Sequence, residues 1–306
     1  MDIARTPEER FAALPDWPFS PRYTDIEAGD ASGARLRVHH VDEGPTDAAT
    51  TLLCMHGEPS WSYLYRAMIP EFTAKGHRVV APDLVGFGRS DKPTSTTDYT
   101  YERHVDWMSQ WLVANNLTNL TLVCQDWGGL IGLRLVAAFP DRFARVVVGN
   151  SGLPTGDRPL SDAFMAWQKY SQTTPVFNVG KLVESGCATK PLDPAIVAAY
   201  DAPYPDDTYK AGARIFPSLA PTTADDPSGI ANRAAWEELR RFDKPFLTTF
   251  SDGDPVTAGG DRIFQREIPG AAGQPHVTIK GAGHFLQEDD GPAWAAIIND
   301  FIERTK

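Results

Sequence analysis

The stretch Leu122-Val123-Cys124-Gln125-Asp126-Trp127-Gly128-Gly129 decides the fold of this chain of 306 residues. Its apolar first half is typical of a buried strand, and a helical pattern of apolar residues follows from Leu130. A sharp turn from strand to helix of this kind holds one side chain above a sheet. The adjoining helix N-terminus favours an anion through its dipole and its free N–H groups. The sequence therefore predicts that Asp126 occupies a nucleophile elbow.

The residue type in this elbow points to an unusual nucleophile. The common form of the motif is Gly-x-Ser-x-Gly, whereas here an aspartate stands in the serine position and Cys124 in the place of the first glycine. A carboxylate is ionised at neutral pH and can attack carbon without first losing a proton to a base. Cysteine is small enough to take the place of this glycine, so we keep the interpretation of this turn as a nucleophile elbow. One alternative remains open here, that Asp126 merely N-caps the following helix.

The rest of the chain alternates between strand and helix patterns. Runs rich in β-branched and apolar residues predict strands over residues 35–41, 51–55, 78–81, 120–125, 145–149, 245–250 and 276–280. Apolar residues at spacings of three and four predict helices, notably over residues 101–116, 128–139 and 292–304. This alternation indicates a mostly parallel central sheet flanked by helices, with the first two strands as an antiparallel edge.

The alternation stops after Ser151. Residues 153–241 are rich in proline, aspartate and aromatic residues, with helix-like pieces at 163–170 and 194–200 and no convincing strand. We interpret this segment as an inserted helical cap. The expected organisation is therefore a core of residues 1–152, a cap of residues 153–241 and the remainder of the core over residues 242–306.

Two further motifs follow predicted strands. The first, His56-Gly57-Glu58-Pro59, is placed to present the Glu58 backbone N–H beside Asp126, where it and the Trp127 N–H would form an oxyanion hole. The second is Gly281-Ala282-Gly283-His284-Phe285, whose histidine is well placed as a base. Together with the elbow they predict a hydrolytic site.

The acid that would orient His284 comes from the loop after residues 245–250. Asp254 is the first choice and Asp252 the alternative, because a short loop past the strand lets the second carboxylate reach back to the catalytic edge. The order Asp126, Asp254, His284 is the order of nucleophile, acid and base in the α/β-hydrolases. The fold class predicted is accordingly an α/β-hydrolase fold with a helical cap.

Composition excludes several other classes. The net charge of −11 and the absence of a long basic run argue against nucleic acid or an anionic membrane as partner. Three cysteines without Cys-x-x-Cys or Cys/His spacing suggest neither a disulfide framework nor a zinc site, so no metal is expected. The polar opening and the lack of about 18 consecutive apolar residues favour a cytoplasmic protein. A monomer is the default expectation.

Over nearly its whole length the sequence resembles the haloalkane dehalogenases, in the subfamily with Glu-Pro after His-Gly and the acid after the cap. The most specific marks are the three motifs above, together with Phe164-Met165-Ala166-Trp167 and Ala202-Pro203-Tyr204-Pro205 in the cap. The resemblance implies that the indole N–H groups of Trp127 and Trp167 bind the departing halide. Phe164 and Phe216 are candidate walls of the substrate tunnel.

The resemblance also implies a two-step reaction without a cofactor. Asp126 would displace halide from a small apolar halogenated substrate and form an alkyl ester. Water activated by His284 would then hydrolyse this ester to alcohol, halide and a proton. Chain length, branching and the preference for bromide or chloride depend on the shape of the tunnel.

Rival functions remain at this point. An epoxide hydrolase would use the same three residues, with a lid tyrosine among Tyr170, Tyr200, Tyr204 and Tyr209. An enzyme that dehalogenates haloacids would need a pair of arginines near the elbow to bind the carboxylate, but Arg134 is the only arginine there. A serine esterase would need a hydroxyl group at position 126, where this sequence has aspartate. A non-catalytic small-molecule receptor on this fold is the alternative from another class.

Overall fold

A computed structural model describes residues 1–31 and 33–306. Eight strands form the central sheet, in the order β10-β9-β8-β7-β4-β5-β3-β2, and β1 pairs with β6 in a separate two-stranded sheet. The strands are β1 (Ile3–Ala4), β2 (Arg22–Glu27), β3 (Arg35–Glu43), β4 (Thr51–Met55), β5 (Arg78–Pro82), β6 (Lys92–Pro93), β7 (Leu120–Gln125), β8 (Phe143–Gly149), β9 (Phe246–Ser251) and β10 (Val277–Ile279).

The sheet is mostly parallel, as predicted, but its antiparallel edge differs from the prediction. β4 pairs in parallel with both β5 and β7, so it lies at the centre of the sheet. The antiparallel pairs are β2 with β3 and β3 with β5. The expectation that residues 35–41 and 51–55 pair with each other is therefore wrong. β4 is buried along its whole length, which suits a central strand.

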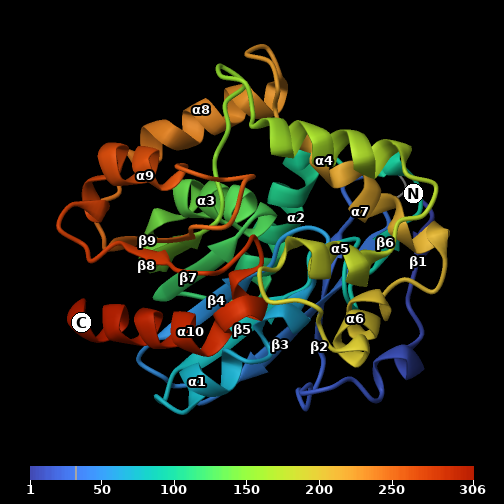
Figure 1. Cartoon of the computed structure of the whole chain (residues 1–306), viewed down its shortest axis with the longest axis horizontal. Helices are drawn as coiled ribbons and strands as arrows, with labels where there is room; N and C mark the ends of the chain where they lie inside the picture. Colours follow the sequence, from blue (N-terminus) through green and yellow to red (C-terminus); the bar gives the residue numbers. More distant parts are fainter. Residues whose placement is uncertain (32) are drawn as a thin grey trace.

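Helices cover both faces of this sheet (Figure 1). One face carries α1 and α10, which contact each other, and the opposite side carries α2, α3 and α8, with α3 packed against both α2 and α8. The helices are α1 (Ile69–Thr73), α2 (Tyr101–Ala114), α3 (Trp127–Ala138), α4 (Asp162–Thr173), α5 (Val179–Gly186), α6 (Pro194–Asp201), α7 (Ala211–Ile215), α8 (Pro227–Leu239), α9 (Asp261–Glu267) and α10 (Leu286–Arg304).

The segment between β8 and β9 contains only helical elements. They are α4 to α8 and the short 3-10 helices η5 (Asp207–Lys210) and η6 (Phe216–Leu219). In Figure 1, α4 to α7 lie together on one side of the sheet. The division of the chain at residues 153 and 241 stays a prediction. Among the described residues, none of the helices combines the length and apolar character that crossing a membrane requires.

The parallel strands bring the predicted site residues to one edge. β4, β7, β8, β9 and β10 run in the same direction, so their carboxyl ends meet at the same side of the sheet. Glu58 follows β4, Asp126 follows β7, Asp254 follows β9 and His284 follows β10. Ligand sites of open α/β sheets lie outside these carboxyl ends, so the topology predicts one shared site.

Candidate active site

Asp126 sits at a strained turn between β7 and α3. Its φ of 52° lies in the left-handed region, which costs a non-glycine residue about 1–3 kcal/mol. Neighbouring chain holds the turn: the Asp126 N–H donates to the Asn150 carbonyl at 3.0 Å, and Ser151 Oγ donates to the Asp126 carbonyl at 2.7 Å. The Asp126 side chain makes no capping hydrogen bond to α3. The N-cap alternative is therefore wrong, and the carboxylate is left available for other contacts.

One oxygen of this carboxylate is held by backbone. Glu58 N–H donates to Asp126 Oδ1 at 2.8 Å. Within residues 1–31 and 33–306, no hydrogen bond joins the Trp127 N–H to the carboxylate, so the structure brings one of the two expected oxyanion donors into contact with it. Gly57 makes the approach possible, because a Cβ atom there would lie 2.3 Å from Asp126 Oδ1.

We expect a Gly57→Ala substitution to lower the rate of halide release by about 100-fold, since a nucleophile displaced by about 1 Å loses its line of attack. The added methyl group would lie 2.4 Å from the Asp126 Cβ atom as well as against its carboxylate, so the melting temperature should also fall. Steady-state halide release and thermal unfolding of the same preparation measure both effects. Native turnover in this variant would contradict the close approach of these two residues.

The other oxygen of Asp126 faces the predicted base. His284 Nε2 lies 3.4 Å from Asp126 Oδ2, and His284 Nδ1 lies 3.0 Å from Asp254 Oδ2. Asp254 is buried and accepts further hydrogen bonds from the Val256 N–H and the Thr257 hydroxyl. Asp252 instead accepts the Gly281 N–H at 2.8 Å and is exposed. Of the two acids considered, Asp254 is therefore the one in contact with His284.

Charge governs the protonation of this cluster. Burial disfavours the imidazolium of His284, but Asp254 and Asp126 outweigh burial and raise its pKa to about 10. Burial also opposes ionisation of Asp254, yet the nearby His284 and the hydrogen bonds from it and from Thr257 lower the pKa of that carboxyl. The charges of Asp254 and Asp126 therefore favour the protonated form of the His284 imidazole.

The Glu58 side chain brings a third carboxyl group to the site. It is buried, and its Oε1 has no hydrogen-bond partner in the described part of the chain. Burial, followed by the charge of Asp126, raises the pKa of Glu58 well above its usual range, while His284 and the Trp167 side chain act in the opposite direction. The Trp167 side chain from α4 therefore lies close to Glu58, which follows β4.

Trp127 and Phe164 lie with Asp126 at one cavity, whereas Phe216 contacts only the Trp127 side of this group. The Trp127 ring is buried, with its centroid 4.5 Å from that of Phe216 and 5.1 Å from that of Tyr101. In the described ranges, Trp127 Nε1 donates no hydrogen bond to another protein group, so this donor is free for a ligand. A cavity of about 790 Å³ is lined by Asp126, Trp127 and Phe164; Phe216, in contrast, packs behind Trp127 and is not part of this lining.

Comparisons with known proteins agree with this geometry. A family model described as alpha/beta hydrolase fold matches residues 50–291. A haloalkane dehalogenase of Psychrobacter cryohalolentis is 60% identical over 302 residues, which cover 99% of this chain and 98% of that protein. The chain belongs to the haloalkane dehalogenase family. Its resemblance to the family, inferred above from motifs, is thereby confirmed.

Two other members of this family extend the comparison. The haloalkane dehalogenase of Mycobacterium marinum is 51% identical, over 97% of this chain and 99% of that protein. The solved structure of haloalkane dehalogenase DpaA from Paraglaciecola agarilytica NO2, described as tetrameric, superposes with a TM-score of 0.88 at 39% identity and covers 97% of each chain. The predicted fold class is therefore confirmed.

Three residues of this family member for which the motifs predict no role contact His284 or its loop. Gln125 Nε2 lies 3.0 Å from His284 Nε2 and also donates to the His284 carbonyl at 3.1 Å. Asn150 donates to the carbonyls of Gly283 and His284, at 2.9 and 3.1 Å, and Ser251 donates to the Gly283 carbonyl. Their positions in the sequence could have indicated them, because each of these residues ends or directly follows a parallel strand.

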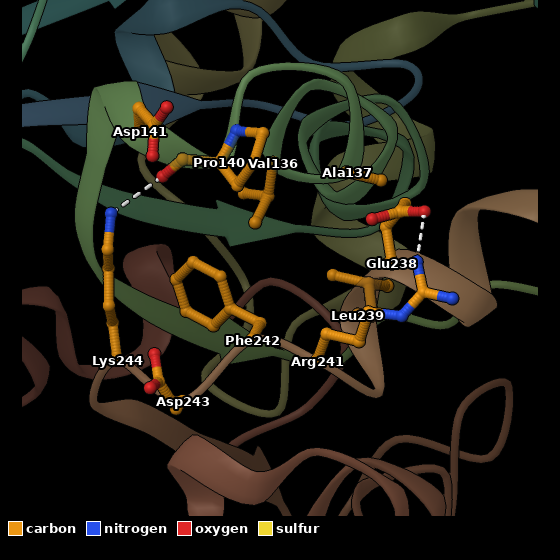
Figure 2. Close-up of a pocket in the computed structure, with 10 residues that line it drawn as sticks. All are labelled: Val136, Ala137, Pro140, Asp141, Glu238, Leu239, Arg241, Phe242, Asp243 and Lys244. Carbon is orange, nitrogen blue, oxygen red and sulfur yellow. Dashed lines mark hydrogen bonds and ion pairs between the residues drawn. The ribbon is translucent and has the colours of Figure 1, made fainter.

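A second pocket of this dehalogenase family member lies away from the site. Its volume is about 210 Å³, and it lies between the end of α3 and the segment joining α8 to β9 (Figure 2). This segment enters β9 at its amino end, the opposite edge from Asp126. Its two cationic groups are partnered: Lys244 donates to the Pro140 carbonyl and Arg241 to Glu238. Within the described ranges, no group of three His, Cys, Asp or Glu side chains is arranged to hold a metal ion.

Proposed function

We propose that this chain hydrolyses the carbon–halogen bond of haloalkanes to alcohol, halide and a proton, through a covalent alkyl ester on Asp126. The observation that carries the proposal is the placement of the Asp126 carboxylate on a strained turn, between the Glu58 N–H and the His284 imidazole. The names of the family members compared above support the substrate class.

In the first step Asp126 attacks the carbon that bears the halogen. Oδ1 is engaged by the Glu58 N–H, so Oδ2 is the oxygen that forms the new carbon–oxygen bond while the carbon–halogen bond breaks. The halide leaves with the bonding electrons. We assign its binding to the indole N–H groups of Trp127 and Trp167, because indole donates without accepting and its apolar ring keeps water from the developing anion.

In the second step water attacks the carbonyl carbon of the ester. His284 takes the proton of this water, and Asp254 stabilises the imidazolium that results. Oδ1 carries the negative charge of the tetrahedral intermediate, beside the Glu58 N–H, and the Trp127 N–H at the start of α3 is the second proposed donor. The bond between Cγ and Oδ2 then breaks, and the His284 imidazolium gives its proton to Oδ2, which leaves as the hydroxyl oxygen of the alcohol. The carboxylic acid that remains, which contains the oxygen of the water, loses its proton to restore the Asp126 carboxylate.

The charge of Asp126 connects the two steps. Alkylation converts this carboxylate into a neutral ester and removes its contribution to the raised pKa of His284. The imidazole pKa therefore falls when the ester forms, toward the value that burial and Asp254 set. Loss of the Asp126 charge thus favours release of the imidazole proton at the stage at which His284 must act as base.

A pH dependence follows for each step separately. Ester hydrolysis should slow as the pH falls through the pKa that His284 has in the alkyl-enzyme, because water is activated only by the neutral imidazole. Alkylation by Asp126 does not need a neutral imidazole, so its rate should not change over the same pH range. Rapid-quench measurements of the halide burst and of ester decay, between about pH 5 and pH 9, separate the two rates. Parallel loss of both rates in mild acid would contradict the assignment of His284 as base.

Of the four cap tyrosines, the structure leaves Tyr204 as the candidate for the tyrosine-assisted alternative. Opening an epoxide would need a tyrosine hydroxyl near Asp126, but Tyr200 is buried and donates to Glu288, while Tyr170 is exposed. Tyr209 does not line the cavity beside Asp126 and Trp127. Tyr204 is buried, its hydroxyl has no hydrogen-bond partner in the described part of the chain, and burial together with the charge of Glu58 raises its pKa well above the usual range. Arg134, the candidate for binding a haloacid carboxylate, donates to Asn232 and Glu102 instead.

The direct test is halide release by the purified chain from 1-bromobutane and 1,2-dibromoethane. Release with formation of the matching alcohol supports the proposal. Hydrolysis of styrene oxide without release from either haloalkane would establish the epoxide hydrolase instead. Binding of haloalkanes without turnover of any of these compounds would establish the receptor.

We keep a monomer as the proposed state in solution, with a mass of 33.6 kDa. The tetrameric description of the Paraglaciecola structure makes the assembly worth measuring directly. Sedimentation at assay concentration gives the mass, and a species of four chains would overturn the monomer.

A further inference from the structure

The loop that carries His284, residues 281–285, is held from two sides. On the core side its carbonyl groups accept hydrogen bonds from Gln125, Asn150 and Ser251, as described above. On the cap side its backbone N–H groups are the donors. His284 N–H donates to the Gly186 carbonyl at the end of α5, at 2.7 Å. The base therefore depends on the position of a cap loop as well as on the sheet.

One carboxylate collects the remaining donors on the cap side. Asp289 Oδ2 accepts the Gly283 N–H at 2.7 Å and the Ala188 N–H at 2.9 Å, and Oδ1 accepts the Thr189 N–H at 2.6 Å. Hydrogen bonds to an ionised acceptor are stronger than those between neutral groups. Asp289 thus joins the loop after α5 to the residue that directly precedes His284.

The two loops that Asp289 joins are in close contact. A Cβ atom on Gly283 would lie 2.4 Å from the Gly186 carbonyl oxygen and 2.8 Å from the Ala188 nitrogen. The backbones can approach this closely only because residue 283 lacks a side chain. A small shift of the cap loop is therefore transmitted to the backbone next to the imidazole.

The element that carries Asp289 is itself anchored. Asp289 belongs to the first turn of α10, which is separated from the rest of that helix by non-helical dihedral angles at Asp290. Its neighbour Glu288 is buried, pairs with Arg66 of the core and accepts a hydrogen bond from Tyr200 of α6. This turn therefore has fixed contacts with both the core and the cap.

We propose that Asp289 is a positioning residue for His284, whose carboxylate sets the imidazole against Asp126 and Asp254 by tying the loop after α5 to the His284 loop. This inference rests on the proposed role of His284 in ester hydrolysis. Alkylation uses Asp126 and does not use the base, so loosening the His284 loop slows hydrolysis of the ester selectively.

The test compares Asp289→Asn with Asp290→Asn as the matched control. Asp290 is the adjacent carboxylate, is exposed, and has no hydrogen bond or ion pair in the described part of the chain. In Asp289→Asn the alkyl-enzyme should decay about tenfold more slowly, while the rate of the halide burst stays within about twofold of the native rate. Intact mass during turnover should show a larger alkylated fraction than in the native protein and in Asp290→Asn.

Amide hydrogen exchange is a readout independent of turnover. Peptides covering residues 186–190 and 281–286 should exchange faster in Asp289→Asn than in Asp290→Asn. Native ester decay in Asp289→Asn, or an equal slowing of alkylation and hydrolysis, would overturn the proposal. If native protein releases no halide, the proposed function fails, and the exchange comparison still tests whether Asp289 joins the two loops. Should Asp289→Asn not fold, Asp289→Ser provides the same comparison.

Discussion

Asp126→Asn is expected to release no halide above background, a loss of about 10⁴-fold or more in turnover. An amide is a poor nucleophile, whereas the ionised carboxylate attacks without prior loss of a proton. The replacement has nearly the same shape, so its carbonyl oxygen can still accept the Glu58 N–H that Oδ1 accepts now at 2.8 Å. The fold should persist for this reason.

Halide release and intact mass of the enzyme after exposure to 1-bromobutane measure this effect. The expected spectrum shows the unmodified mass only, and the thermal transition should resemble that of the native protein. Mass analysis also excludes hydrolysis of the asparagine back to aspartate as a source of activity. Alkylation of the Asp126→Asn protein at a native rate would place the nucleophile elsewhere and overturn the mechanism.

His284→Phe is expected to stop the reaction after one turnover. Asp126 still displaces halide, but phenylalanine accepts no proton from water, so the alkyl ester accumulates and its hydrolysis slows by about 10²–10⁴-fold. The ring replaces the imidazole with a similar flat shape beside Phe285, whose ring centroid lies 4.9 Å from that of His284.

The measurement is a halide burst of one equivalent per active site, together with a mass increase equal to the alkyl group on a peptide that contains Asp126. The double variant Asp126→Asn with His284→Phe is the matched control, since it retains the altered loop but cannot form the ester. Continued turnover in His284→Phe would show that another group serves as base. Absence of the burst as well would show that the imidazolium contributes to alkylation.

Much of the fold could be predicted because its local signals are strong. The limits of the strands at residues 51–55 and 120–125 agree with β4 and β7, since both are short, buried and bounded by turn residues. β2 (Arg22–Glu27) was not predicted, because its local signal is weak. It is an edge strand in which only Ile26 is buried, so its residues carry no clear apolar alternation.

The amino-acid sequence by itself determined the turn at Asp126, the order of Asp126, Asp254 and His284 along the chain, and the helical character of the segment before β9. These features depend on residue types and spacings within a few neighbouring positions. Only the tertiary structure decided which strands pair, that Asp254 rather than Asp252 contacts His284, and that Asp289 joins the cap loop to the base loop. Each of these depends on contacts between distant segments, which the sheet and its flanking layers bring within hydrogen-bond reach and which local spacing does not encode.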